Sequence, residues 1–220
     1  MLDLIGQIAP RATAQVLCIG AHCDDIEIGC GGALQVLQAR RSKLKIHWVV
    51  ASSTAERRAE TEQARSMLVG PKQRGELIFG EFPDGLFPAH YAAVKQFVES
   101  LKRLPTPDLI FCHERADRHQ DHRIINEMVW NTFRDHVILE YEIPKWDGGL
   151  GQPTVYVPLS KAQLQTKIDA LLRSFPSQRQ RYWFTADTFR GLARVRGVEC
   201  RASDGFAEAF HAPKLRFGGL

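Results

Sequence analysis

Two short stretches of the sequence concentrate side chains that can bind a metal ion or move protons. The first, residues 16–32 (VLCIGAHCDDIEIGCGG), passes from an apolar run to His22, Asp24 and Asp25 and then to a cluster of glycines. The second, residues 113–123 (HERADRHQDHR), follows the apolar run PDLIFC and holds three histidines and two aspartates. Such clusters are costly to desolvate unless they are paired or bind a ligand.

The residue types in the two stretches are those of a catalytic metal site. If both stretches close strands of one parallel sheet, His22 and Asp25 meet one or more of His113, His119 and His122 at its carboxyl edge. Two histidines and one carboxylate form a catalytic zinc set that leaves a position open for water. Adjacent aspartates at a strand end cannot face one ion in the same way, so one would bind it and the other would act as general base. Either stretch alone is a weak signal, but together they predict metal-assisted hydrolysis.

The apolar pattern predicts an α/β fold with three Rossmann-like layers, in which a mostly parallel β-sheet is flanked by helices. Short apolar runs typical of strands buried on both faces occupy residues 14–22, 43–53, 75–81, 107–114, 136–144 and 153–160. Apolar residues at helical spacing occupy 31–41, 55–70, 89–104, 121–135 and 160–175. Their alternation predicts right-handed crossovers and a ligand crevice at the carboxyl ends of the strands.

Length and composition indicate one domain, spanning residues 1–220, with residues 145–220 completing the substrate pocket. The net charge of +4 is too small to indicate nucleic-acid binding, although it favours an anionic substrate. Five scattered cysteines without paired spacing predict a reducing compartment. The amino terminus has no basic signal region, and no apolar run approaches the roughly 18 residues of a membrane span. We therefore expect a soluble, cytoplasmic protein without a membrane span.

On these motifs the sequence resembles the PIG-L/LmbE family of zinc-dependent deacetylases, which act largely on substrates that contain N-acetylglucosamine. AHCDDIEIGCGG matches the family's (A/P)-H-P-D-D motif and the glycine segment after it, and HQDH at residues 119–122 matches its H-x-D-H motif. The resemblance implies one zinc ion bound by His22, Asp25 and His122, with Asp24 as general base towards the attacking water. The implied reaction releases acetate and a free amine from an amino sugar.

The resemblance also implies roles outside the metal set. His119 would stabilise the oxyanion and protonate the leaving amine, and Asp121 would hold and polarise the His119 ring. The segment RRAETEQARSML resembles an R-x-x-E segment of the family whose arginine contacts substrate, which favours Arg57, with Arg58 as its close competitor. Families of this kind often assemble into trimers or hexamers, so a homo-oligomer is expected.

Two positions depart from the family pattern. Cys23 replaces the proline that is common between the metal-binding histidine and the base, and Ile26 stands where many members have a glutamate. Cys23 removes a fixed backbone angle and adds a soft potential ligand, although neither departure removes an essential ligand. The spacing of the glycines in GCGG is not that of a phosphate-binding loop and predicts close helix packing instead.

Two alternative functions and the role of the tail remain open at the level of sequence. One is an amidase that cleaves a larger acyl group from an amino sugar, and another is a catalytically silent sugar-binding module, which would have no need of Asp24. The role of the tail is also open: Trp146 and Trp183 could stack on a sugar ring, or they could simply pack. Its arginines, Arg179, Arg181, Arg190, Arg194 and Arg196, could bind an anion or be solvated.

Overall fold

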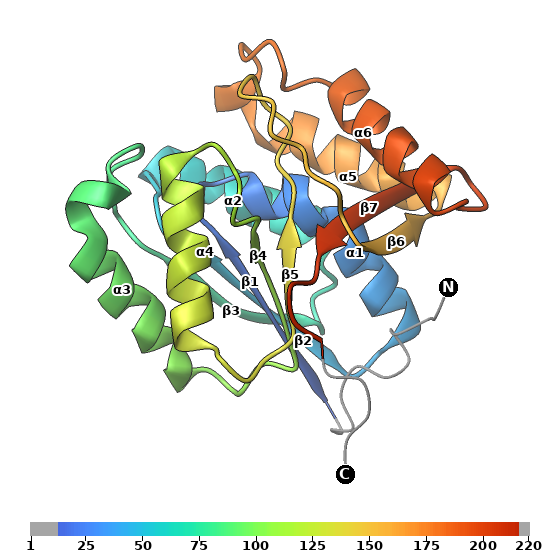
Figure 1. Ribbon diagram of the computed structural model, residues 1–220. Helices are drawn as coiled ribbons and strands as arrows, with labels where there is room; N and C mark the ends of the chain where they lie inside the picture. Colours follow the sequence, from blue (N-terminus) through green and yellow to red (C-terminus); the bar gives the residue numbers. More distant parts are fainter. Residues whose placement is uncertain (1–12, 216–220) are drawn as a thin grey trace.

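A seven-stranded sheet runs through the middle of the computed structural model, which describes residues 13–215 (Figure 1). The amino-terminal residues 1–12, on which the prediction of no signal segment mainly rests, lie outside the described part. The strands are β1 (Ala14–Gly20), β2 (Leu44–Val50), β3 (Arg74–Phe79), β4 (Leu109–His113), β5 (Ile138–Tyr141), β6 (Val155–Leu159) and β7 (Phe206–His211). The first five are mutually parallel, and β7 is antiparallel to both β5 and β6. The predicted, mostly parallel sheet is confirmed.

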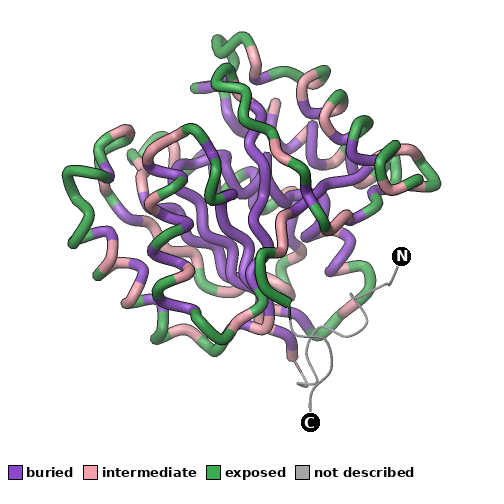
Figure 2. The backbone as a smooth tube through the Cα atoms, in the orientation of Figure 1, coloured by how far each residue is buried: buried purple, intermediate pink, exposed green. Residues whose placement is uncertain are grey.

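Helices cover both faces of the sheet, as the apolar runs require. They are α1 (Asp25–Arg40), α2 (Ala55–Leu68), α3 (Tyr91–Ser100), α4 (Gln120–Thr132), α5 (Lys161–Ser174) and α6 (Ala186–Glu199), with short 3-10 turns η2 (Phe87–His90), η3 (Leu101–Arg103) and η4 (Pro176–Gln178). Val16 and Cys18 point towards α1, α2 and α5, whereas Leu17 and Ile19 point towards α3 and α4. Figure 2 shows the buried sheet between the two helical layers. Within residues 13–215, every helix is too short or too polar for a membrane span.

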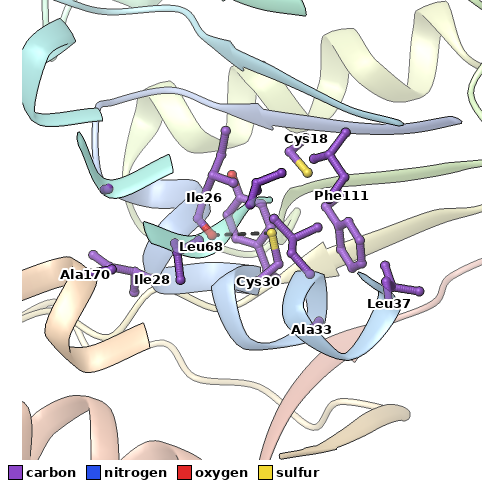
Figure 3. Packing of buried hydrophobic residues seen from close by; sticks show 14 of the residues in the cluster. Cys18, Ile26, Ile28, Cys30, Ala33, Leu37, Leu68, Phe111 and Ala170 are labelled. Carbon is purple, nitrogen blue, oxygen red and sulfur yellow. Dashed lines mark hydrogen bonds between the residues drawn. The ribbon is translucent and has the colours of Figure 1, made fainter. Parts of the chain in front are cut away.

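The larger of the two cores lies where α1 crosses the sheet (Figure 3). Cys18 of β1 and Phe111 of β4 pack there with Cys30 of α1 and Leu68 of α2, all at most 2% exposed. The Cys30 thiol donates a hydrogen bond to the Ile26 carbonyl at 3.3 Å. The chain's five cysteines are all free thiols. Cys30 therefore behaves as a small apolar residue of the core.

The carboxyl-terminal segment is more regular than the sequence pattern indicated. Helix α6 and strand β7 lie beyond residue 175, where the sequence pattern predicted no further helix or strand, and β7 inserts between β5 and β6. Glu208 of β7 ties this segment to α1, because its carboxylate accepts the backbone N–H groups of Gly32 and Ala33 at 2.8 and 2.7 Å. Lys167 of α5 donates to the same carboxylate at 2.6 Å. The carboxyl-terminal segment is thus part of the central sheet.

The strand order places the two candidate stretches side by side. The order is β3-β2-β1-β4-β5-β7-β6, so β1 and β4 are neighbours from which the chain winds outward in both directions. In α/β sheets the carboxyl ends of the strands at such a switch point form the ligand crevice. His22 follows β1, and His113 ends β4. The topology therefore brings both clusters to the place where a ligand is expected.

Candidate active site

Three side chains that the sequence assigns to the metal converge at the carboxyl ends of β1 and β4. Nδ1 of His22 lies 3.2 Å from Nε2 of His122. The carboxylate of Asp25 lies 3.5 Å from each of these nitrogens, through Oδ2 to His22 and through Oδ1 to His122. All three residues are buried. Asp25 is the first residue of α1, and His122 lies in the first turn of α4, so two helix starts and one strand end fix the set.

The donor set fits a zinc ion. Zinc at about 2.0–2.1 Å from tetrahedral nitrogen and oxygen ligands holds those ligand atoms about 3.3 Å apart. The nitrogens of His22 and His122 are 3.2 Å apart, and each lies 3.5 Å from a different oxygen of Asp25, which is close to that value. Two imidazoles with one carboxylate are also a donor set of catalytic zinc sites, which leave the fourth position for water or substrate. His22, Asp25 and His122 could therefore hold an ion, and within the described residues His119 and His113 also lie in groups whose ligand atoms are close enough to share one.

A buried carboxylate lies behind His22. Oδ2 of Asp121 is 3.2 Å from Nε2 of His22, and Oδ1 of Asp84 is 2.9 Å from the same nitrogen. Burial lowers the pKa of His22, but hydrogen bonds to Asp121, Asp25 and Asp84 outweigh burial and raise this pKa well above its ordinary value. Without metal, His22 therefore carries a second proton, which an incoming metal ion must displace.

Asp121 has a partner that the sequence did not predict. It was expected to hold the ring of His119, but its carboxylate contacts His22 and accepts the backbone N–H groups of Gly85 and Phe87 at 2.6 and 3.1 Å. Among residues 13–215, the hydrogen bond that joins Asp121 to His119 runs instead from the Asp121 backbone N–H to Nδ1 of His119, at 3.3 Å. The Asp121 side chain extends from the first turn of α4 towards the loop after β3 and not towards the His119 ring.

A second carboxylate, which the sequence did not single out, lies behind His122. Oδ2 of Asp117 is 2.9 Å from Nδ1 of His122. Nζ of Lys145 lies 2.7 Å from both oxygens of Asp117. Burial and the neighbouring His113 lower the pKa of His122 to about 3, so this imidazole is neutral. Asp117 belongs to the quoted stretch HERADRHQDHR, but only the fold reveals Lys145 beside it.

Asp24, the predicted general base, lies beside the metal set at the start of α1. Its backbone adopts φ 128° and ψ −22°, and its carboxylate is buried. Burial raises the pKa of Asp24 to about 7, against the opposing effect of the Arg57 guanidinium. A carboxylate with a pKa near neutrality is suited to general base catalysis.

Arg57, the predicted substrate contact, is engaged within the protein. Its Nη2 lies 3.2 Å from Oδ1 of Asp24 and donates to the backbone carbonyl of Cys23. Its competitor Arg58 instead pairs with Glu81 at 2.6 Å. Of the two, Arg57 is thus the arginine that faces the site, and its contact there is with the candidate base.

His119 and His113 flank His122 and have different environments. The His119 ring stacks on His122 with centroids 4.6 Å apart and is half-buried. Because Nδ1 of His119 accepts a backbone N–H, the proton of the neutral ring lies on Nε2. Nε2 of His113 accepts the backbone N–H of Ala21 at 2.9 Å and lies 3.1 Å from Oδ2 of Asp25. His113, which the residue pattern left open as a ligand, therefore contacts the proposed ligand Asp25 from the end of β4.

The tail residues considered for substrate binding divide into packed and exposed ones. Arg196 is buried and pairs with Glu142 at 2.5 Å, and Trp183 packs against Phe184 with centroids 5.6 Å apart. Trp146 is 63% exposed on the connection after β5. A hollow of about 700 Å³ lies along the outer side of α4, and its lining includes none of the candidate metal ligands. Trp146, Arg179, Arg181 and Arg194 are therefore the exposed residues among these candidates.

Comparison with known proteins gives the family of this chain and proteins of similar fold. The family model described as PIG-L: GlcNAc-PI de-N-acetylase matches residues 17–133, which include both motifs. Among solved structures, the conserved protein TT1542 from Thermus thermophilus is 21% identical, with 93% of this chain and 96% of that chain covered and a TM-score of 0.71. N,N'-diacetylchitobiose deacetylase from Pyrococcus horikoshii is 18% identical, with 91% and 84% covered and a TM-score of 0.65.

A third solved structure shows how far the likeness of fold extends. GalB, the 4-carboxy-2-hydroxymuconate hydratase from Pseudomonas putida KT2440, is 15% identical, with 94% of this chain and 99% of that chain covered and a TM-score of 0.73. A hydratase and a deacetylase therefore share this fold, which by itself does not decide the reaction. The family model is more specific, and because it matches more than half of the 220 residues, the chain belongs to the PIG-L family.

Proposed function

We propose that the protein is a zinc-dependent hydrolase that removes the N-acetyl group from an N-acetylglucosamine-type amino sugar, releasing acetate and a free amine. The observation that carries this proposal is the convergence of His22, Asp25 and His122 within 3.5 Å of one another, with the buried carboxylate of Asp24 on the adjacent residue. Membership of the PIG-L family and the fold shared with a chitobiose deacetylase support it.

The metal supplies Lewis-acid chemistry: when bound, zinc polarises an amide carbonyl and lowers the pKa of water. The chain's own residues supply the proton transfers. Asp24 takes a proton from the attacking water, for which its pKa of about 7 is suited. Nε2–H of His119 donates a hydrogen bond to the oxygen on which negative charge develops.

The proton for the leaving amine comes most simply from Asp24. Burial lowers the pKa of His119, so its ring is neutral near pH 7 and can donate a hydrogen bond without acting as a strong acid. Asp24, having taken up the proton of the water, is then the acid beside the reacting centre. This assignment differs from the role that the family resemblance implies for His119.

Release of acetate tests the proposal. The wild-type protein, loaded with zinc, is incubated with a panel of N-acetylglucosamine derivatives, alongside the same sugars carrying longer N-acyl groups and an unsaturated dicarboxylate as a hydratase substrate. We expect acetate and a free amine from at least one N-acetyl sugar, and loss of this release after chelation. Turnover confined to longer acyl groups would favour the amidase, and water addition to the unsaturated acid would contradict the proposal.

A further inference from the structure

Three buried charged or polar side chains, linked by hydrogen bonds, run from His122 to the connection after β5. Nδ1 of His122 lies 2.9 Å from Oδ2 of Asp117, and Nζ of Lys145 lies 2.7 Å from both oxygens of that carboxylate. The three side chains are only 3%, 5% and 9% exposed. Hydrogen bonds between ionised groups shielded from water are among the stronger ones in proteins.

The hydrogen-bond donors and acceptors of these three side chains fix the orientation of the His122 ring. An ammonium group has donors only, so both oxygens of Asp117 accept from Lys145. The Asp117 carboxylate therefore accepts from His122 as well, and the proton of the neutral ring lies on Nδ1. The lone pair of Nε2 then faces Nδ1 of His22 and the carboxylate of Asp25, where the proposed ion would bind.

Lys145 belongs to a segment that also contacts the tail. The connection between β5 and β6 rises above the carboxyl edge of the sheet (Figure 1). Glu142, at its start, accepts from Nε and Nη2 of Arg196 at 2.9 and 2.5 Å, and the carbonyl of Gly151 accepts from Arg196 at 3.1 Å. Arg196 thus holds this segment from α6, while Lys145 joins it to the centre of the site.

We propose that Asp117 and Lys145 are positioning residues for the metal ligand His122, and that Lys145 makes the affinity of the metal site depend on the connection after β5. The inference rests on the proposed metal site but not on the identity of the substrate. Partners of this kind typically change metal affinity by about 10–100-fold when they are removed.

A purely structural role for Asp117 is the main alternative. Its Oδ1 also accepts the backbone N–H of His119 at 2.7 Å, at the start of α4, so removing Asp117 could simply loosen the helix. Lys145 separates the two roles, because its ammonium touches the carboxylate and not the helix backbone. A structural role predicts a less stable protein with unchanged zinc affinity once it is folded.

The test is zinc affinity of the full chain, measured by competition with a chelator, for the variants Lys145→Met, Lys145→Arg, Asp117→Asn and the double variant Lys145→Met/Asp117→Asn. Lys95→Met is the matched control, because Lys95 pairs with Glu99 at 2.6 Å on α3, away from the site. We expect Lys145→Met to weaken zinc binding about tenfold and Asp117→Asn by about 10–100-fold. Lys145→Arg should restore most of the loss, the double variant should bind no more weakly than Asp117→Asn, and the control should match wild type.

Wild-type affinity in Lys145→Met would overturn the inference, whatever the effect on stability. If Asp117→Asn does not fold, the comparison of Lys145→Met with Lys145→Arg and Lys95→Met carries the test alone. Cobalt substitution gives a second readout, because a misaligned His122 changes the visible spectrum of the bound ion. A wild-type protein that binds zinc but releases no acetate leaves this inference standing and removes the proposed function, and one that binds no metal removes both.

Discussion

Asp24 has a backbone conformation that residues with a side chain rarely adopt. At φ 128° and ψ −22° it lies outside the allowed regions for L-residues, and such strain costs about 1–3 kcal/mol. The following residue, Asp25, begins α1, so the turn at Asp24 separates two adjacent carboxylates into different directions. One carboxylate therefore lies against His22 and His122 and the other against Arg57.

At the residue scale, we expect Arg57 to affect the rate of the reaction more than the binding of substrate. Because its guanidinium contacts the Asp24 carboxylate and the Cys23 carbonyl, Arg57→Met should release the base from its position and lower kcat by about 10–100-fold. A residue that only bound substrate would mainly raise KM. Steady-state kinetics on the substrate found in the panel measures the difference. Arg58→Met is the matched control and should keep wild-type kcat, and a change confined to KM in Arg57→Met would contradict this assignment.

At the scale of elements, the glycines of α1 allow the helix to lie close to its neighbours. A Cβ at Gly29 would lie 2.3 Å from the ring of Tyr141, and one at Gly32 would lie 2.6 Å from Leu159. Tyr141 cannot easily move, since its hydroxyl donates to the Ile19 carbonyl at 2.7 Å within the sheet. The prediction that GCGG serves close packing is therefore confirmed.

A pair of alanine substitutions in α1 tests this packing. Gly29→Ala should lower the free energy of unfolding by about 3 kcal/mol, because the new methyl group overlaps a fixed ring. At Gly31 the nearest atom would be Cδ1 of Leu68 at 3.3 Å, the end of a flexible side chain. The gain in helix propensity of about 1 kcal/mol offsets that contact, so Gly31→Ala should remain within about 1 kcal/mol of wild type. Urea denaturation measures both, and equal effects would contradict the account.

His47 makes the outer edge of the sheet sensitive to pH. It lies on β2 where the register with β3 shifts, and its Nδ1 accepts the backbone N–H of Glu76 at 3.1 Å. Nε2 lies 3.0 Å from the carbonyl oxygen of the Gln15 side chain, to which it donates. The contact with Glu76 requires the neutral ring, because a protonated Nδ1 cannot accept a hydrogen bond. Burial, with Arg65 and Lys45 nearby, lowers the pKa of His47.

Stability should therefore fall as His47 is forced to protonate. With the folded pKa below the unfolded value of about 6.5, the unfolded chain binds the proton first, so this contribution is present above pH 6.5 and is lost as pH falls below it. We expect the free energy of unfolding to drop between pH 7.5 and 5.5 more in wild type than in His47→Gln, by at most about 1.4 kcal/mol per pH unit. Denaturation at both pH values measures this, and parallel pH profiles would refute it.

At the scale of the whole molecule, the site is a consequence of topology. The pattern of apolar runs predicted the five parallel strands and β6, because strands covered on both faces must be continuously apolar. Since β1 and β4 meet where the strand order reverses, the two candidate stretches could be placed together from the sequence pattern, whereas the choice of His122 over His113 and His119 came from the family resemblance. The distances between the side-chain atoms of His22, Asp25 and His122 are set by the segment after β1 and by the first turns of α1 and α4, to which these residues belong.

Features that depend on partners from distant segments could not be predicted. Strand β7 was missed because its buried Glu208 looks like a surface residue until Lys167 and the amides of α1 satisfy it. Helix α6 contains Gly191 and Gly197, which weaken its helical signal. Likewise, the partner of Asp121 and the approach of Lys145 to Asp117 depend on loop paths that carry no local signal.

The zinc content of purified wild type, His122→Ala and Asp24→Asn, read together with acetate release, tests the proposed metal site and base. We expect about one zinc ion per chain in wild type and in Asp24→Asn, and a large loss in His122→Ala. Asp24→Asn should keep the ion but lose turnover, since it removes the base and leaves the three ligands in place. A wild-type protein without metal, or a His122→Ala protein that retains a full complement, would contradict the assignment of His22, Asp25 and His122.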